Sequence, residues 1–237
     1  MDKTSLDWPG RAAVILYSIL FVLGLAAAIF YFSTGNSIVG RISKSIPVLL
    51  MALALIPLIG KSTYIRLVFL GLVFGASADF LIDSSFLLGL VVFLISHLAY
   101  IAAFFQDTRR VQLSRGLPAF AFGAFVYIGV MIVGSVGALA VPVGFYSLAI
   151  SVMLWRASER LGLTSIPRRS ALAGFVGAIL FILSDSILAY RLFVGPLPLE
   201  QINVMLPYWL GQLGIALSAI WHLRSEPTAD AHLRQTR

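Results

Sequence analysis

Two aspartates stand inside strongly apolar sequence, Asp79 in "GASADFLIDSSF" and Asp185 in "GAILFILSDSILAY". An ionised carboxylate is costly in hydrocarbon, so an acid within a membrane span is by default a hypothesis of a functional site. Two carboxylates in a pocket of low polarity can act as a protonated acid and an ionised base, or as a proton relay. The sequence therefore points to acid–base chemistry inside a membrane.

The elements that must position these acids are membrane helices. The chain has 237 residues, of which 59% are hydrophobic and 11% charged, against roughly 25% charged in a soluble domain. Apolar runs long enough to cross the hydrocarbon core predict an all-α integral membrane protein, a bundle of eight transmembrane helices. The expected spans are about 13–32, 46–60, 67–82, 86–105, 117–134, 139–155, 171–190 and 203–222. They form one domain, 1–222, followed by a polar cytoplasmic tail, 223–237.

Basic residues predict the orientation of this bundle. Fourteen Lys and Arg fall on the side of the two termini, and only Arg41, Lys44 and Arg191 fall on the other side. Cytoplasmic loops carry the excess of such residues, so we expect a multi-pass protein with both termini in the cytoplasm, in the plasma or inner membrane if it is bacterial. The net charge of +7 then reports orientation and lipid headgroups rather than nucleic acid.

The absence of cysteine excludes disulfides, thiolate metal sites and cysteine nucleophiles. We expect no metal and no cofactor, and no protein partner is predicted. The expected partners are the lipid bilayer and whatever the acids act on.

The two acids lie at matched depth. Asp79 follows Arg66 by thirteen residues and Asp185 follows Ser170 by fifteen, which places them roughly 20 Å and 22 Å from the cytoplasmic face. Their helices run in the same direction, so both carboxylates can face one pocket. The other polar residues of the spans that we group with them are Ser96, His97, Tyr100, Ser184, Tyr208 and Gln212.

Each polar residue also has a structural interpretation. A single Gln or Ser in a membrane helix more often joins helices than does chemistry, and a single His can bond a backbone carbonyl. Asp83 is expected to be a turn residue between two spans. Gly71, Gly75, Gly174 and Gly177 are expected to allow close helix packing. Asp79 and Asp185 are the residues that such interpretations explain least well.

A faint repeat relates the two halves of the chain. "ADFLI" and "SDSIL" occupy the third span of each half, and "SHLAYI" and "GQLGIA" occupy the fourth. This predicts a 4+4 parallel pseudo-repeat with one acid in each half. Sites of repeat-built membrane proteins tend to lie between the halves.

These segments resemble a known family. The stretch from Lys44 to Pro47, Asp79 late in its span, "SHLAYI", "GAILFILSDSILA" and "YWLGQL" are similar, in order and spacing, to the YhhN-type lysoplasmalogenase family of eight-span membrane proteins. This chain has Ala78-Asp79 where the family usually has Gly-Asp. It also separates Lys44 from Pro47 by two residues, where the family has Lys and Pro adjacent.

The resemblance implies an enzyme, a hydrolase that cleaves the sn-1 vinyl-ether bond of a lysoplasmalogen of the ethanolamine or choline type. The products would be a fatty aldehyde and a glycerophospho-alcohol. Asp79 and Asp185 would share the roles of general acid and base, in an order that the sequence leaves open. His97, Gln212 and Tyr208 would orient them, with Ser184 and Tyr100 beside them. Lys44 and Arg191 would contact the phosphate of the lysophospholipid substrate.

Two alternatives of other classes stay open. Paired acids near a histidine also suit a proton-coupled transporter, and a parallel repeat suits alternating access. A purely structural scaffold leaves two acids at matched depth unexplained. An enzyme turns over lipid in detergent, whereas a transporter requires a sealed vesicle and a gradient.

Overall fold

The computed structural model describes residues 11–34 and 37–223. Its α-helices are α1 (Arg11–Thr34), α2 (Ile38–Leu55), α3 (Thr63–Ile82), α4 (Phe86–Asp107), α5 (Leu113–Val133), α6 (Ala140–Glu159), α7 (Arg168–Phe193) and α8 (Glu200–His222). Two short 3-10 helices, η1 (Ile56–Lys61) and η2 (Gly137–Leu139), lie in the connections. Within these ranges, eight helices are long and apolar enough to cross a membrane, which confirms the all-α, eight-span fold. The tail that we expected lies almost wholly outside the described residues.

The main difference from the expected boundaries is in α2. This helix begins at Ile38 rather than near residue 46, and Ser37 caps it by accepting a hydrogen bond from the amide of Gly40. Hydropathy marks only the apolar part of a helix, and here the first two turns also carry charge. Lys44 therefore lies inside α2, not in a loop before it, and its ammonium group pairs with Asp83.

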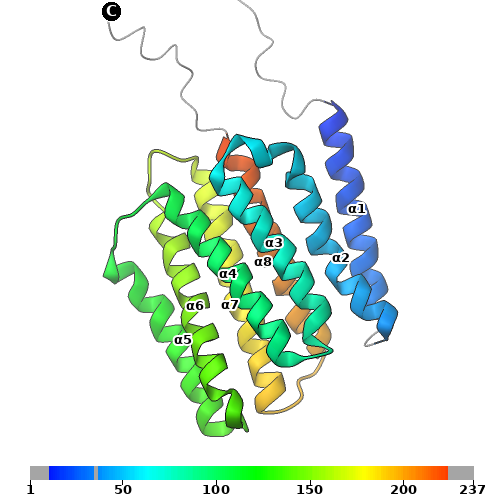
Figure 1. The fold of residues 1–237 in the computed structure, drawn as a ribbon, viewed down its shortest axis with the longest axis vertical. Coiled ribbons are helices and arrows are strands. Elements are labelled where there is room, and N and C mark those ends of the chain that lie inside the picture. Colours follow the sequence, from blue (N-terminus) through cyan, green and yellow to red (C-terminus); the bar gives the residue numbers. More distant parts are fainter. Residues whose placement is uncertain (1–10, 35–36, 224–237) are drawn as a thin grey trace, which may run out of the picture.

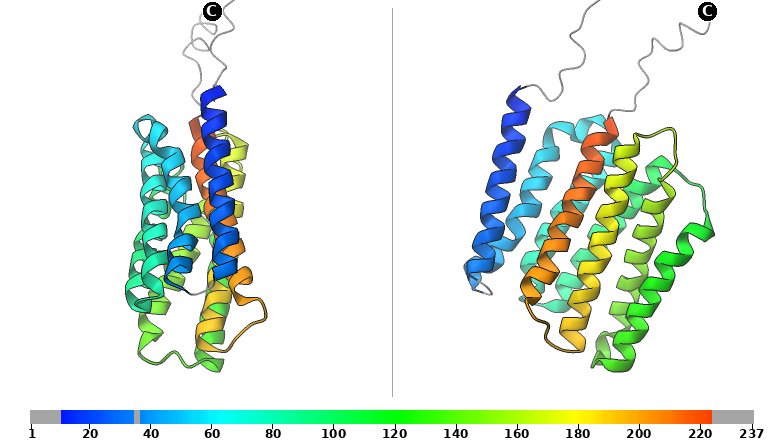
Figure 2. Two further views of the ribbon diagram at one scale, coloured as in Figure 1. Left: turned by 90° about the vertical axis from the view of Figure 1, so that its right-hand side faces the viewer. Right: turned by 180° about the vertical axis from the view of Figure 1, so that it is seen from behind.

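The helices form a central group with an edge pair on each side. The most extensive contacts between helices are those within the hairpins α3–α4 and α7–α8. In Figure 1 the hairpin α3–α4 lies in front of the hairpin α7–α8. Helix α1 packs on α2 at one edge, and α5 packs on α6 at the other (Figure 2). The start of α1 and the end of α8 lie at the same end of the bundle, which we call the terminal end; the opposite end is the far end.

The contacts between helices follow the two-half arrangement. Helix α2 contacts α3 and α8, and its counterpart α6 contacts α7 and α4. Asp79 lies in the last turn of α3 and Asp185 lies at the corresponding level of α7, so both acids are closer to the far end. A 4+4 parallel repeat predicts that α2, α3 and α4 of the first half correspond to α6, α7 and α8 of the second half.

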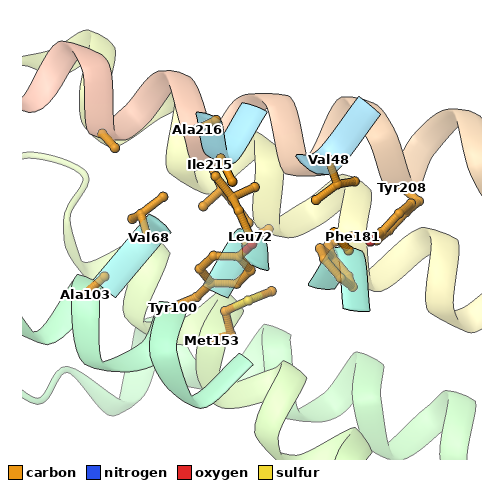
Figure 3. Close-up of a cluster of buried hydrophobic side chains, with 14 of the residues drawn as sticks. Val48, Val68, Leu72, Tyr100, Ala103, Met153, Phe181, Tyr208, Ile215 and Ala216 are labelled. Carbon is orange, nitrogen blue, oxygen red and sulfur yellow. The ribbon is translucent and has the colours of Figure 1, made fainter. Parts of the chain in front are cut away.

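The core lies where the two hairpins and α6 meet. Leu72, Tyr100, Met153, Phe181 and Ile215 converge from five helices and are fully buried (Figure 3). Small residues allow this approach, because a Cβ atom at Gly177 would lie 2.7 Å from the carbonyl oxygen of Gly211 in α8. Side chains facing outward are apolar on most helices, as expected where lipid replaces water.

Candidate functional site

A glycine face on α3 makes room for polar side chains in the core. A Cβ atom at Gly71 would lie 2.2 Å from the ring of Tyr100, and one at Gly75 would lie 2.8 Å from the amide nitrogen of Gln212. Tyr100 and Gln212 come from α4 and α8, so the two glycines let three helices bring polar groups together. The glycines expected to allow close packing thus also shape the site.

A chain of hydrogen bonds ends on Asp79. The hydroxyl of Tyr100 donates to the Oε1 atom of Gln212 at 2.6 Å, and the Nε2 atom of Gln212 donates to the hydroxyl of Tyr208 at 3.3 Å. Tyr208 in turn donates to the Oδ2 atom of Asp79 at 2.8 Å. Asp79 is only 4% exposed, and three helices contribute to this chain. Every bond points toward the carboxylate, an arrangement that stabilises its ionised form.

Asp185 lies beside a cavity instead. Its Oδ2 atom accepts a hydrogen bond from the hydroxyl of Tyr146 in α6, and part of its surface is exposed. The cavity lies among α4, α5, α6 and α7, and its volume of about 70 Å³ corresponds to about two water molecules. Most of the lining is apolar. Among the described residues, Asp185 is the one carboxyl side chain that lines the cavity.

Aromatic rings connect the surroundings of the two acids. The ring of His97 lies edge-on to Tyr146 and to Phe181, with centroids 5.1 Å and 4.7 Å away. Phe181 lies 5.3 Å from Tyr208, which holds Asp79. His97 is fully buried; its Nδ1 atom lies 2.6 Å from the carbonyl oxygen of Phe93, and its Nε2 atom has no hydrogen-bond partner in the part of the chain that the structure describes.

The acids also differ in the charges that act on them. Lys44 is 5% exposed, and its ammonium group lies 2.5 Å from the Oδ2 atom of Asp83. Its charge acts on Asp79 as well, whereas the partner of Asp185 is the uncharged hydroxyl of Tyr146. Asp83 does end α3 at a turn, as expected, but it also pairs with Lys44, whose charge acts on Asp79.

Other residues of the expected set make printed hydrogen bonds or ion pairs with groups other than the two acids. The hydroxyl of Ser184 donates to the carbonyl oxygen of Val204, joining α7 to α8, and that of Ser96 donates to the carbonyl oxygen of Gly71. Arg191 pairs with Glu200 across the loop that joins α7 and α8, at 3.4 Å. Within the described ranges, no cluster of three or more His, Asp or Glu side chains could hold a metal ion.

Sequence reasoning missed Tyr146. A tyrosine in the apolar run "VGFYSLAI" looks like any other aromatic residue that packs against neighbouring helices. In the structure Tyr146 and Lys44 are each the seventh residue of their helices, α6 and α2, but the expected spans began at residues 139 and 46, so the sequence did not align the two.

Comparison with known proteins adds an independent finding. The model of the YhhN family matches residues 39–219, from the start of α2 to the last turn of α8. Lysoplasmalogenase TMEM86A of Bos taurus is 34% identical over 175 residues, or 72% of this chain and 71% of that protein. Its Homo sapiens counterpart is 35% identical over 158 residues, or 65% of each chain. Lysoplasmalogenase TMEM86B of Homo sapiens is 31% identical over 179 residues, or 75% of this chain and 74% of that protein. No solved structure matches this chain.

Proposed function

This chain belongs to the YhhN family, and from that premise we propose that it is a membrane hydrolase that cleaves the vinyl-ether bond of lysoplasmalogens. The relatives named above carry the name lysoplasmalogenase. The observation that carries the proposal is a pair of aspartates at matched depth, each bound by a tyrosine hydroxyl from a neighbouring helix. Asp185 borders a cavity, and Asp79 accepts the last bond of a hydrogen-bond chain. Two carboxyls in such different surroundings suit the roles of acid and base.

We assign the acid to Asp185 and the base to Asp79. Asp79 accepts the hydrogen bond of Tyr208 at the end of the polar chain, and the charge of Lys44 acts on it, so its surroundings suit a carboxylate that takes a proton from water. Asp185 borders the apolar cavity that the substrate would enter, so its carboxyl is the one that can reach the vinyl ether and give it a proton. The two carboxyls thus have environments that separate their roles, as in other enzymes that use paired carboxyls.

The proposed reaction begins when Asp185 gives its proton to the β-carbon of the vinyl ether, leaving an oxocarbenium ion. Water then adds to the cationic carbon and gives one proton to Asp79. The product of this addition is a hemiacetal. The hemiacetal collapses to a fatty aldehyde and the free alcohol of the glycerophospho group, and the proton held by Asp79 returns to Asp185. One water molecule is consumed and no electrons are exchanged. His97, with its unpartnered Nε2 atom, is a suitable acceptor for that water.

A lipid chain requires more room than the cavity now has. We propose that α5 moves to admit it, because α5 forms one wall of the cavity and makes few contacts with α7 on the opposite wall. The phosphate would then lie at the far end, near Arg41, Lys44 and Arg191. Among the described residues the Nε atom of Arg41 is buried without a hydrogen-bond partner, and the other two cations pair with carboxylates that a phosphate could replace.

The test is aldehyde release by the purified protein in detergent from a 1-alkenyl lysophosphatidylethanolamine. We expect Asp79→Asn and Asp185→Asn to lower kcat by about 10² to 10⁴-fold, the usual contribution of general acid–base catalysis. Ser77→Ala on the lipid-facing side of α3 is the control and should keep parental activity, because its exposed hydroxyl donates to the carbonyl oxygen of Val73 in its own helix.

The chemistry is checked by running the reaction in D2O. Protonation at the β-carbon places one deuterium at C2 of the released aldehyde, and the saturated alkyl-ether analogue should not react. Full activity of Asp185→Asn would contradict the assignment of Asp185 as the general acid. A folded parent protein that releases no aldehyde would overturn the proposed function.

A further inference from the structure

A long groove runs down the edge of the bundle between α1 and α8. Helix α1 contacts α2 but leans away from α8, as the rear view in Figure 2 shows. The space between them has α2 as its floor and a volume of about 1620 Å³, larger than the roughly 300 to 1,000 Å³ of a drug-sized ligand site. On α8 its lining extends from Leu206 to Leu223, about 26 Å of helix.

The lining of this groove is suited to hydrocarbon. It consists mostly of Leu, Ile, Val, Ala and aromatic side chains, and residues of α1 such as Phe21, Val22 and Leu25 are more than half exposed. Apolar walls that face each other across such a space in a bilayer must be covered by lipid chains or by another apolar surface. The groove is therefore a place for something with long apolar segments.

The two ends of the groove differ. At the far end Tyr31, Phe32 and Trp209 pack together, with ring centroids 5.5 to 6.0 Å apart, and Phe32 and Trp209 belong to the lining of the groove. At the terminal end the lining includes Tyr17, Trp221 and Lys61. Lys61 is exposed, and among the described residues it is the one charged side chain that lines the groove.

The terminal end thus has the chemistry of a headgroup site. Tyrosine and tryptophan prefer the level of the lipid headgroups, where their rings are apolar and their polar atoms meet water. A lysine at the same level attracts the phosphate of an anionic lipid. The positive charge of Lys61 thus complements a phosphate at the terminal end of the groove, where polar atoms join the apolar lining.

We propose that this groove binds an anionic diacyl phospholipid from the leaflet at the terminal end. Its acyl chains lie between α1 and α8, and its phosphate contacts Lys61. This site is separate from the acid–base site, because the Tyr31, Phe32 and Trp209 rings lie between the groove and the residues around Lys44. The proposal does not depend on the hydrolase activity, since a diacyl ester lipid has no vinyl ether.

Native mass spectrometry of the delipidated protein, titrated with phosphatidylglycerol or with phosphatidylcholine, tests this site. We expect one phosphatidylglycerol to bind more tightly than phosphatidylcholine. Lys61→Gln should weaken phosphatidylglycerol binding by about fivefold and leave phosphatidylcholine unchanged, the effect of one lysine near a charged membrane surface. Arg66→Gln is the control, because Arg66 is exposed at the same end but does not line the groove.

A second pair of variants tests where the chains lie. Leu210 and Leu70 are 45% and 43% exposed, and only Leu210 lines the groove. Leu210→Trp should therefore reduce binding of the single lipid, whereas Leu70→Trp should not. Equal effects of the two Trp variants, equal affinity for both headgroups, or a dimer that forms in place of lipid binding would each overturn the proposal.

Discussion

Tyr146 and Tyr208 each donate a hydroxyl hydrogen bond to an aspartate, yet the two aspartates lie in different surroundings. Asp79 is sealed behind a polar chain and beside a lysine, while Asp185 borders an apolar cavity. At the scale of single residues, neighbours rather than residue type distinguish the proposed base from the proposed acid.

We predict that Tyr146→Phe lowers kcat for vinyl-ether hydrolysis by about tenfold or more. The lost hydrogen bond to a carboxyl group is worth about 1.5 to 3 kcal/mol, and Asp185 would lose the group that orients it. Tyr127→Phe is a matched control, because Tyr127 lines the same cavity but donates to the carbonyl oxygen of Ala140. Steady-state aldehyde release measures both; the same loss in the two variants would argue against a role through Asp185.

A glycine of α3 gives a second test at this scale. Gly75→Ala places a methyl group 2.8 Å from the Nε2 atom of Gln212, so this amide and the Tyr208 hydroxyl must shift. We expect a clear loss of turnover with little change in expression. Gly129→Ala in α5 meets no atom within 4 Å and should behave as the parent. A Gly75→Ala protein with parental activity would show that the polar chain is not needed.

At the scale of elements, buried charges connect helices at the terminal end. Arg156 of α6 is fully buried and donates to the carbonyl oxygens of Thr108 and Arg110 and to Glu159. Its guanidinium group also lies 3.8 Å from the ring centroid of Phe105. These contacts fix the α4–α5 connection to α6, which in turn holds Tyr146 at Asp185.

We predict that Arg156→Met strongly destabilises the protein. The change leaves Glu159 buried without its cation, for which losses of about 3 to 5 kcal/mol are typical. Thermal unfolding in detergent should show a large fall in Tm, whereas Arg169→Met, at an exposed position, should leave Tm nearly unchanged. Adding Glu159→Leu to Arg156→Met should recover part of the loss; no recovery would mean that the carbonyl contacts matter more than the charge.

At the scale of the whole molecule, the two halves place their acids at the same level. Corresponding helices of the two halves also begin and end at the same ends of the bundle. The fourteen-to-three distribution of basic residues, set on this arrangement, supports a terminal end that faces the cytoplasm. The proposed phosphate site and the acids then lie toward the outer leaflet, and the groove headgroup site toward the inner leaflet.

The absence of cysteine makes this orientation directly testable. Ser135→Cys and Ser165→Cys place single thiols at exposed positions in the α5–α6 and α6–α7 connections, at opposite ends of the bundle. We expect a membrane-impermeant maleimide to label Ser135→Cys in intact cells and Ser165→Cys only after permeabilisation. The reverse pattern would invert the bundle and both proposed leaflets.

The sequence by itself determined the eight helices, and it also predicted their orientation and the matched depth of Asp79 and Asp185. These properties are local, because they depend on the length of apolar runs and on the rise of a helix. It also supplied the family, through motifs in α3, α4, α7 and α8.

Only the tertiary structure decided which side chains meet. That Tyr146 holds Asp185, that Lys44 pairs with Asp83, and that Gly75 makes room for Gln212 depend on contacts between helices far apart in the chain. The early start of α2 was missed for a related reason, since a lysine is acceptable within a buried helix only when a distant carboxylate pairs with it. Periodicity describes a single helix, whereas these choices are set by how several helices pack.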